Sequence, residues 1–227
     1  MKITILPITR AYKIHYRGDR MIAVILAAGL SKRFGGKKLL AKVNQKSMVL
    51  HVTDLVSSLS FDKKILVYSD EEVLREIENN CTKALEFQFL YNEQSYKGLS
   101  TSIRLAIENL FLKKGNEGIM FFVADQPFID AATVNKLVDA FYQGKGSIIV
   151  PVYSEGRGNP VIFSNKWTEQ LKNLEGDVGG RIIIRENPGE VWEVFINDSQ
   201  IGKDIDTKDE YSALQNERNQ NSHEYTE

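Results

Sequence analysis

The sequence predicts an α/β protein with a Rossmann-like, doubly wound and mostly parallel sheet that carries a small antiparallel segment. Apolar runs at 21–26 and 118–124 have the composition of strands that are buried on both faces. Segments with helical spacing of apolar residues alternate with these strands along the chain. Because such folds bind ligands at the carboxyl ends of their parallel strands, the residues that follow each strand are the first candidates for a site.

The first half of the chain contains three predicted strands and two predicted helices. Residues 21–26 are wholly apolar, and residues 47–59 place apolar side chains at helical spacing. The short apolar segment 65–68 predicts the second strand. Residues 71–79 predict a helix with a capped, acidic first turn, and the alternating segment 85–91 predicts a third strand.

The second half continues the pattern and then departs from it. Residues 100–112 and 131–142 predict helices, and residues 118–124 and 147–152 predict the strands that follow them. Beyond Tyr153 the alternation weakens. There, segments 156–163 and 191–196 suggest a smaller antiparallel part of the sheet.

Composition predicts one soluble domain. The chain has 227 residues, of which 42% are hydrophobic and 26% charged, with a net charge of −1 and one cysteine, Cys81. We expect residues 1–20 to be an N-terminal extension or the product of an upstream start codon, 21–213 to be a single domain, and 214–227 to be a polar tail. The near-neutral charge and the lack of a membrane-length apolar run predict a cytoplasmic protein that binds neither nucleic acid nor membrane.

The segment after the first strand is typical of a phosphate-binding loop. Residues 26–40 read Leu-Ala-Ala-Gly-Leu-Ser-Lys-Arg-Phe-Gly-Gly-Lys-Lys-Leu-Leu. Small residues let backbone amides approach an anion, and Arg33 and Lys38 can neutralise it. The spacing excludes a Walker loop, because Ser31 stands where the first glycine is required, and it excludes the dinucleotide fingerprint G-x-G-x-x-G. The alternative is a strand–helix connection with a solvated basic face.

Carboxylates follow at two places. Asp125 ends the apolar strand 118–124, where it could bind Mg²⁺, or it could cap the next helix, for which Asp130 is better placed. If residues 204–206 are extended, Asp204 and Asp206 share a face and repel each other unless a cation lies between them. Asp206 or Thr207 could instead cap a helix that begins at Lys208.

Three polar segments complete the candidate site. Ser100 and Ser102 lie at the start of a predicted helix, where they could cap the helix or bind a nucleotide. The turn 156–160 and the loop 175–181 are too polar for the core, so each could line a pocket.

The ordered set of motifs resembles the nucleotidyltransferases of molybdenum cofactor maturation, and within them the molybdenum cofactor cytidylyltransferases. The motifs are L-A-A-G-x-S-x-R-F-G-x-x-K-L-L, G-x-S-x-S-I-R, D-Q-P, R-G-N-P-V, G-D-x-G-x-R and D-I-D-T, and the resemblance covers residues 21–210. It implies that residues 21–213 form a nucleotidyltransferase domain. In that reaction the terminal phosphate of molybdopterin attacks the α-phosphorus of CTP and releases pyrophosphate. Neither residues 1–20 nor the tail takes part in the resemblance.

The resemblance also implies roles for individual residues. The catalytic residues would be Arg33, Lys38 and Asp125. The nucleotide would contact Leu26, Ala27, Ala28, Gly29, Arg33, Lys38, Ser100, Ser102 and Asp125. The acceptor would contact Asn159, Asp177, Gly179 and Arg181. Mg²⁺ would be held by Asp125 together with Asp204 or Asp206.

The base and the acceptor have alternatives. Family members with guanine specificity tend to carry Gly-Gly at the position of Ala28-Gly29, so this sequence favours CTP over GTP. Another phosphorylated acceptor, such as a sugar or polyol phosphate, would use the same chemistry. The chain could also be an accessory protein that delivers the cofactor to a client molybdoenzyme. A nicotinamide oxidoreductase is disfavoured by the missing dinucleotide fingerprint.

Overall fold

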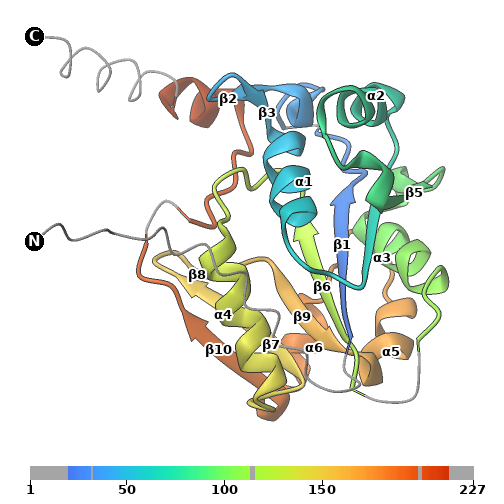
Figure 1. Cartoon of the computed structure of the whole chain (residues 1–227), viewed down its shortest axis with the longest axis vertical. Helices are drawn as coiled ribbons and strands as arrows, with labels where there is room; N and C mark the ends of the chain where they lie inside the picture. The colour runs from blue at the N-terminus through green and yellow to red at the C-terminus, as the bar shows by residue number, and fades with distance from the viewer. Residues whose placement is uncertain (1–19, 32, 113–115, 199–200, 215–227) are drawn as a thin grey trace, which may run out of the picture.

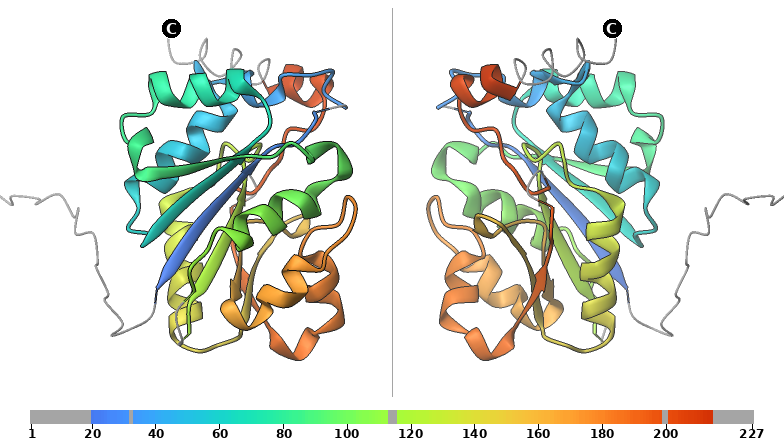
Figure 2. Two further views of the ribbon diagram at one scale, coloured as in Figure 1. Left: turned by 90° about the vertical axis from the view of Figure 1, so that its right-hand side faces the viewer. Right: turned by 90° about the vertical axis from the view of Figure 1, so that its left-hand side faces the viewer.

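The computed structural model describes residues 20–31, 33–112, 116–198 and 201–214. The predicted extension, apart from Arg20, and the predicted tail, apart from Leu214, lie outside the described residues. The described chain forms the predicted α/β fold, in which one large sheet lies between two layers of helices (Figure 1, Figure 2). None of the helices within these ranges is long and apolar enough to cross a membrane.

The large sheet has the strand order β10-β7-β9-β6-β1-β4-β5, and β8 pairs with β7. Its strands are β1 (Met21–Ala27), β4 (Lys63–Tyr68), β5 (Phe87–Tyr91), β6 (Gly118–Val123), β7 (Ile148–Tyr153), β8 (Gly156–Arg157), β9 (Val161–Ser164) and β10 (Val191–Phe195). A separate hairpin joins β2 (Lys42–Val43) and β3 (Lys46–Ser47). The central strand β1 pairs in parallel with β4 and β6, with Val24 opposite Ile65 and Phe121.

The antiparallel part of the sheet differs from its prediction in one strand. β9 runs antiparallel between β6 and β7, and β8 is antiparallel to β7, as predicted for residues 156–163. The prediction was wrong for residues 191–196, because β10 pairs in parallel with β7. The chain between β9 and β10 crosses over through helices, which returns it in the direction of β7.

In the part of the chain that the structure describes, three α-helices cover each face of the sheet. The helices α1 (Met48–Ser58), α2 (Glu71–Asn80) and α4 (Ala131–Tyr142) pack on one face, and α3 (Leu99–Glu108), α5 (Thr168–Lys172) and α6 (Arg181–Glu186) pack on the other. Short 3₁₀ helices are η1 (Lys38–Leu40), η2 (Ala84–Glu86), η3 (Ser95–Lys97), η4 (Asn165–Trp167) and η5 (Pro188–Glu190). Every residue of β1 is buried, with Ile25 facing the first layer and Val24 the second, which explains its uniformly apolar sequence.

Candidate active site

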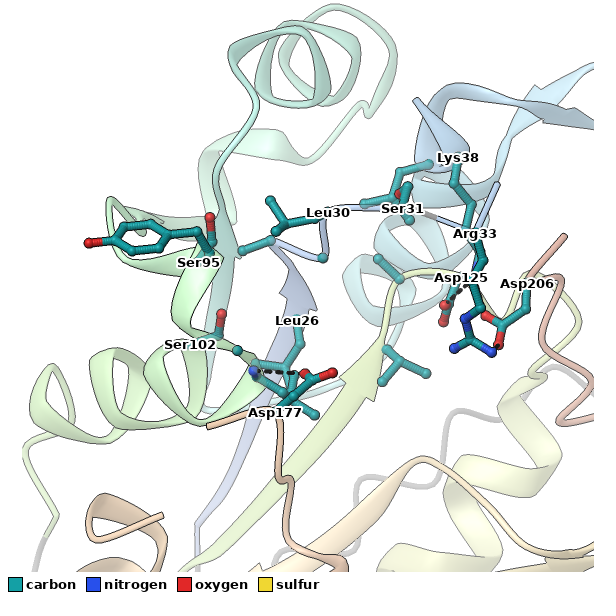
Figure 3. Close-up of a pocket in the computed structure, with 18 of the residues that line it drawn as sticks. Leu26, Leu30, Ser31, Arg33, Lys38, Ser95, Ser102, Asp125, Asp177 and Asp206 are labelled. Atoms are coloured by element: carbon teal, nitrogen blue, oxygen red, sulfur yellow. Dashed lines mark hydrogen bonds and ion pairs between the residues drawn. The ribbon is translucent and has the colours of Figure 1, made fainter. Parts of the chain in front are cut away.

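The carboxyl ends of β1, β4 and β6 meet at one edge of the sheet, and a cavity of about 610 Å³ opens there (Figure 3). Such a volume suits a small organic ligand. The cavity is lined by Leu26, Ala28, Gly29, Leu30, Ser31, Arg33, Lys38, Leu39, Ser95, Tyr96, Lys97, Gly98, Leu99, Ser102, Val123, Ala124, Asp125, Asp177 and Asp206. We call it the nucleotide pocket, after the ligand that the sequence analysis expects at Ala28, Arg33 and Lys38.

The loop after β1 turns back over the strand ends. The carbonyl oxygen of Ser31 accepts hydrogen bonds from the amides of Phe34 and Gly36, each at 3.1 Å. Positive φ angles of 80° at Gly35 and 97° at Gly36 are conformations that glycine adopts without strain. Phe34 is buried against Met48 and Ile205, so a small apolar cluster fixes the loop. This anchor holds the neighbouring side chains Arg33 and Lys38 above the sheet edge.

Four charged side chains meet at one end of the nucleotide pocket. The Nζ of Lys38 lies 2.7 Å from Oδ2 of Asp125 and 2.6 Å from Oδ1 of Asp206. The Nη1 of Arg33 lies 2.9 Å from Oδ2 of Asp206. Only 6% of the Lys38 side chain is exposed, against 26% for Asp125 and 28% for Asp206. Figure 3 shows Arg33, Asp125 and Asp206 together, with Ser95, Ser102 and Asp177 at the other end.

These contacts shift the pKa of three groups. Burial disfavours the charged form of Lys38, but the charge and hydrogen bonds of Asp125 and Asp206 outweigh it and raise the Lys38 pKa. Burial also opposes ionisation of Asp206, yet Lys38 and Arg33 hold its pKa below the usual value. The pKa of Asp204 is raised, first by partial loss of solvent and then by the charges of Asp206 and Asp125. At neutral pH Lys38 is therefore an ammonium and Asp206 a carboxylate.

Asp206→Asn is expected to make the free energy of unfolding less sensitive to a fall in pH. Because the folded-state pKa of Asp206 is below the usual 3.8, its ionisation stabilises the fold above that pH, and this contribution disappears as the pH falls through the lowered pKa. Urea unfolding should show a wild-type advantage that is constant from about pH 5 to pH 7 and shrinks below about pH 4. An advantage that persists unchanged at low pH would contradict the assignment. Asp209→Asn, at an exposed position on the following helix, is the matched control.

Hydrogen bonds at the starts of two helices show which residues cap them, and so decide whether Asp125 and Asp206 act as caps. The Oδ1 of Asp130 accepts a hydrogen bond of 2.8 Å from the amide of Thr133, so Asp130 caps α4 and Asp125 does not. The hydroxyl of Thr207 accepts from the amide of Glu210 at 3.2 Å, and the Glu210 carboxylate accepts from the Thr207 amide at 2.9 Å. This reciprocal cap begins the helix at 208–214 and leaves the Asp206 carboxylate to the ion pairs.

The start of α3 forms the opposite end of the nucleotide pocket. Gly98 has a φ of 112°, and the amide of Leu99 donates to Oδ1 of Asp177 at 3.2 Å. The buried Asn92 donates to the hydroxyl of Ser102 at 2.9 Å, which fixes Ser102 at the pocket wall. Gly98 is therefore the N-cap of α3, in place of the serine caps that the sequence allowed, and Ser100 is only 1% exposed.

Gly98→Ala is expected to destabilise the protein by about 2–3 kcal/mol. A Cβ at this position would lie 2.4 Å from the backbone of Gly176, and the positive φ adds strain. Gly189→Ala is the matched control, since its Cβ would meet nothing within 4 Å. Chemical denaturation should show the loss in Gly98→Ala and not in Gly189→Ala. Equal stability of the two variants would contradict the close approach of residue 98 to the backbone of Gly176.

A second, smaller cavity of about 190 Å³ is lined partly by residues next to those of the nucleotide pocket. Gln126 and Asp204 line it, whereas Asp125 and Asp206 line the nucleotide pocket. The Gln126 side chain donates to the carbonyl of Gly202 at 2.8 Å, which ties the two segments together. The full lining is Gln126, Tyr153, Ser154, Glu155, Gly156, Arg157, Gly158, Asn159, Arg181, Ile201, Gly202, Lys203 and Asp204. We call it the acceptor pocket, after the ligand that the sequence analysis expects at Asn159 and Arg181.

Tyr153 shapes the acceptor pocket. Its hydroxyl donates to the carbonyl of Asn159 at 2.6 Å, and burial raises its pKa, so it stays protonated. Its ring lies where a Cβ on Gly158 or Gly202 would stand, within 2.6 Å and 2.4 Å respectively. Only glycine lets both segments pack against this ring.

Residues 23–191 match the family described as the MobA-like NTP transferase domain. The chain belongs to this family. It is a nucleotidyltransferase, and its fold agrees with that class.

Relatives of this NTP transferase differ in their names. The probable molybdenum cofactor guanylyltransferase of Pyrococcus horikoshii is 37% identical over 158 residues, which cover 67% of this chain and 73% of that protein. The purine catabolism protein PucB of Bacillus subtilis is 27% identical over 205 residues, which cover 87% of this chain and 97% of that protein. The crystal structure of Rv0371c from Mycobacterium tuberculosis has the same fold, with a TM-score of 0.73, 24% identity, and coverage of 87% of this chain and 98% of that one.

Most predicted site residues of this NTP transferase lie in one of the two pockets. The nucleotide pocket contains Leu26, Ala28, Gly29, Arg33, Lys38, Ser102, Asp125, Asp177 and Asp206, and the acceptor pocket contains Asn159, Arg181 and Asp204. Asp177, which was predicted to contact the acceptor, lies in the same cavity as Arg33 and Lys38. Asp204 and Asp206 flank the buried Ile205 as predicted, but they line different pockets.

Three predicted residues line neither pocket: Ala27, Ser100 and Gly179. Ala27 belongs to the core on the other face of β1, and Ser100 is buried. Gly179 packs against Leu99, whose Cδ2 lies 2.9 Å from the place of a Cβ.

Residues that the sequence analysis missed are Leu30, Ser95, Tyr96, Lys97 and Leu99 in the nucleotide pocket, and Gln126, Tyr153 and Lys203 in the acceptor pocket. Tyr153 could have been found as the last residue of a strand. The segment 95–97 carries no comparable signal.

A divalent cation fits the nucleotide pocket only when a bound phosphate compound supplies further ligands to it. Among the described residues, no three His, Cys, Asp or Glu side chains lie close enough together to hold a metal. Asp125 and Asp206 are two carboxylates that share one cation, and Mg²⁺ is commonly held by one or two carboxylates plus substrate phosphates. The donor set therefore suits a metal–nucleotide complex.

Proposed function

We propose that this nucleotidyltransferase transfers the nucleoside monophosphate of an NTP to the phosphate of molybdopterin and releases pyrophosphate. The observation that carries the proposal is the cluster of Arg33, Lys38, Asp125 and Asp206 at the carboxyl edge of the sheet. Gln126 and Asp204, which lie close to two of these residues in the chain, line the second pocket. Molybdopterin as the acceptor is supported by the ordered motifs and by relatives named molybdenum cofactor guanylyltransferases.

In this proposal the triphosphate lies in the nucleotide pocket, with Arg33 and Lys38 binding its oxygens. A phosphate oxygen of the acceptor attacks the α-phosphorus in line, and the bond to the bridging oxygen of the β-phosphate breaks, so that pyrophosphate leaves with both bonding electrons. Mg²⁺, held by Asp125 and Asp206, would neutralise charge on the phosphates. The side chains act by positioning and by charge neutralisation rather than as covalent nucleophiles.

The acceptor pocket has the charge that a phosphorylated acceptor requires. It is lined by Arg157, Arg181 and Lys203 against Glu155 and Asp204. Arg157 is paired with Glu193 at 2.6 Å, whereas neither Arg181 nor Lys203 forms an ion pair with any residue that the structure describes. These two cations are available to an anion, and a phosphate is their natural ligand.

The base has two candidates. CTP is favoured by Ala28, whose methyl group lines the nucleotide pocket where guanine-specific relatives tend to carry glycine. GTP is favoured by the names of several relatives. A thermal-shift comparison of CTP, GTP, ATP and UTP with Mg²⁺ separates these candidates, because the preferred nucleotide stabilises the folded protein most.

Pyrophosphate release tests the acceptor. We expect release from the preferred nucleotide with molybdopterin and much less with sugar or polyol phosphates. If release is fastest with a sugar or polyol phosphate, that compound and not molybdopterin would be the acceptor. Nucleotide binding without release in the presence of any acceptor would favour an accessory protein that delivers the cofactor.

A further inference from the structure

We infer that the Lys38 ammonium takes the position that the divalent cation needs, so that metal enters this site only together with the nucleotide. The inference rests on the proposed function, in which Asp125 and Asp206 hold the metal. It adds an order of events, because Lys38 must exchange its carboxylate partners for triphosphate oxygens before a cation can bind between them.

The geometry is that of a cation bridging two carboxylates. The Nζ of Lys38 lies 2.7 Å from Asp125 and 2.6 Å from Asp206, both within hydrogen-bond distance. Residues 38 and 206 are 168 positions apart, and the apolar cluster around Phe34 and Ile205 brings their segments together. Lys38 is also the first residue of η1. The bridge therefore depends on how the loop packs, and its lysine side chain is only 6% exposed.

The charges of the cluster are already balanced. The ammonium of Lys38 and the guanidinium of Arg33 face the carboxylates of Asp125 and Asp206, so two positive charges balance two negative ones. A divalent cation that approached this cluster would meet two like charges at short range. No three His, Cys, Asp or Glu side chains among the described residues form a group that could hold a metal ion by themselves. Free metal therefore gains little from the site.

A triphosphate reverses this balance. Its oxygens offer Lys38 and Arg33 new anionic partners, and it brings further ligands for the metal. The lysine side chain has a flexible four-carbon stem, so its ammonium can move without displacement of the loop. Once it moves, Asp125 and Asp206 are two adjacent unpaired carboxylates, and a divalent cation relieves their repulsion.

Manganese binding followed by electron paramagnetic resonance tests the inference. Without nucleotide, we expect Lys38→Met to bind Mn²⁺ at least about tenfold more tightly than the wild type, because the competing ammonium is gone. Adding Asp125→Asn to Lys38→Met should remove the new site. Lys37→Met is the matched control, because Lys37 pairs with Glu72 at 2.7 Å and should leave Mn²⁺ binding as in the wild type.

Outcomes separate this inference from the proposed function. Equal Mn²⁺ affinity of the wild type and Lys38→Met without nucleotide would overturn the inference alone. If the wild type takes up no protein-bound Mn²⁺ with either CTP or GTP, the proposed metal site fails as well. We expect protein-bound Mn²⁺ with one of these nucleotides and none without.

A second measurement uses the wild-type protein, so it does not depend on whether the Lys38→Met variant folds. In protein labelled with ¹⁵N-lysine, the ammonium resonance of Lys38 should stay in place when Mg²⁺ alone is added and shift when metal-free CTP or GTP is added. A shift with Mg²⁺ alone would show that metal displaces Lys38 by itself and would contradict the order of binding.

Discussion

Asp125→Asn is expected to lower the rate of pyrophosphate release by about 10³-fold or more. The substitution keeps the shape of the side chain and its hydrogen-bonding oxygen for Lys38, but it removes the negative charge that the metal–nucleotide complex requires. Asp125 does not cap a helix, because Asp130 caps α4. The folded structure should therefore survive, and circular dichroism should show an unchanged spectrum.

Glu72→Gln is the control for Asp125→Asn. Glu72 also pairs with a lysine of the same loop, Lys37, but it does not line the nucleotide pocket. Its substitution should leave turnover close to that of the wild type. Wild-type turnover in Asp125→Asn would remove Asp125 from the metal site.

Lys38→Met is expected to lower kcat/KM for the NTP by about 10²–10³-fold, through weaker triphosphate binding and lost charge neutralisation in the transition state. It should bind metal better and turn over more slowly, a combination that general unfolding does not produce. Steady-state kinetics with the preferred nucleotide measures the loss. Lys37→Met, one residue away, should change it little, and equal losses in the two variants would argue for a nonspecific effect of loop charge.

The parts of the site that follow strand ends could be predicted from the sequence. An apolar strand that ends in an acid places Asp125 at the sheet edge, and the residues after the first strand place Arg33 and Lys38 there. What could not be predicted is the pairing of Lys38 with Asp206. It depends on how a distant segment folds back over the loop, and only the packed cluster around Ile205 shows it.

The direction of a strand and the side to which each residue faces account for the other differences between prediction and structure. β10 was predicted to be antiparallel because the pattern of side chains along a strand does not encode its direction. Ala27 was assigned to the nucleotide although side chains alternate along a strand, and its neighbours Leu26 and Ala28 face the pocket instead. Asp204 and Asp206 line different pockets, a separation that local spacing does not reveal.

The central claim is that the nucleotidyl group passes from NTP to the phosphate of the acceptor. The most direct test uses CTP and GTP labelled with ³²P at either the α or the γ position, incubated with the protein, Mg²⁺ and molybdopterin. We predict that the α label of one nucleotide appears in a molybdopterin dinucleotide and its γ label in pyrophosphate. Appearance of the γ label in free orthophosphate, or the absence of α label from the acceptor with both nucleotides, would contradict the claim.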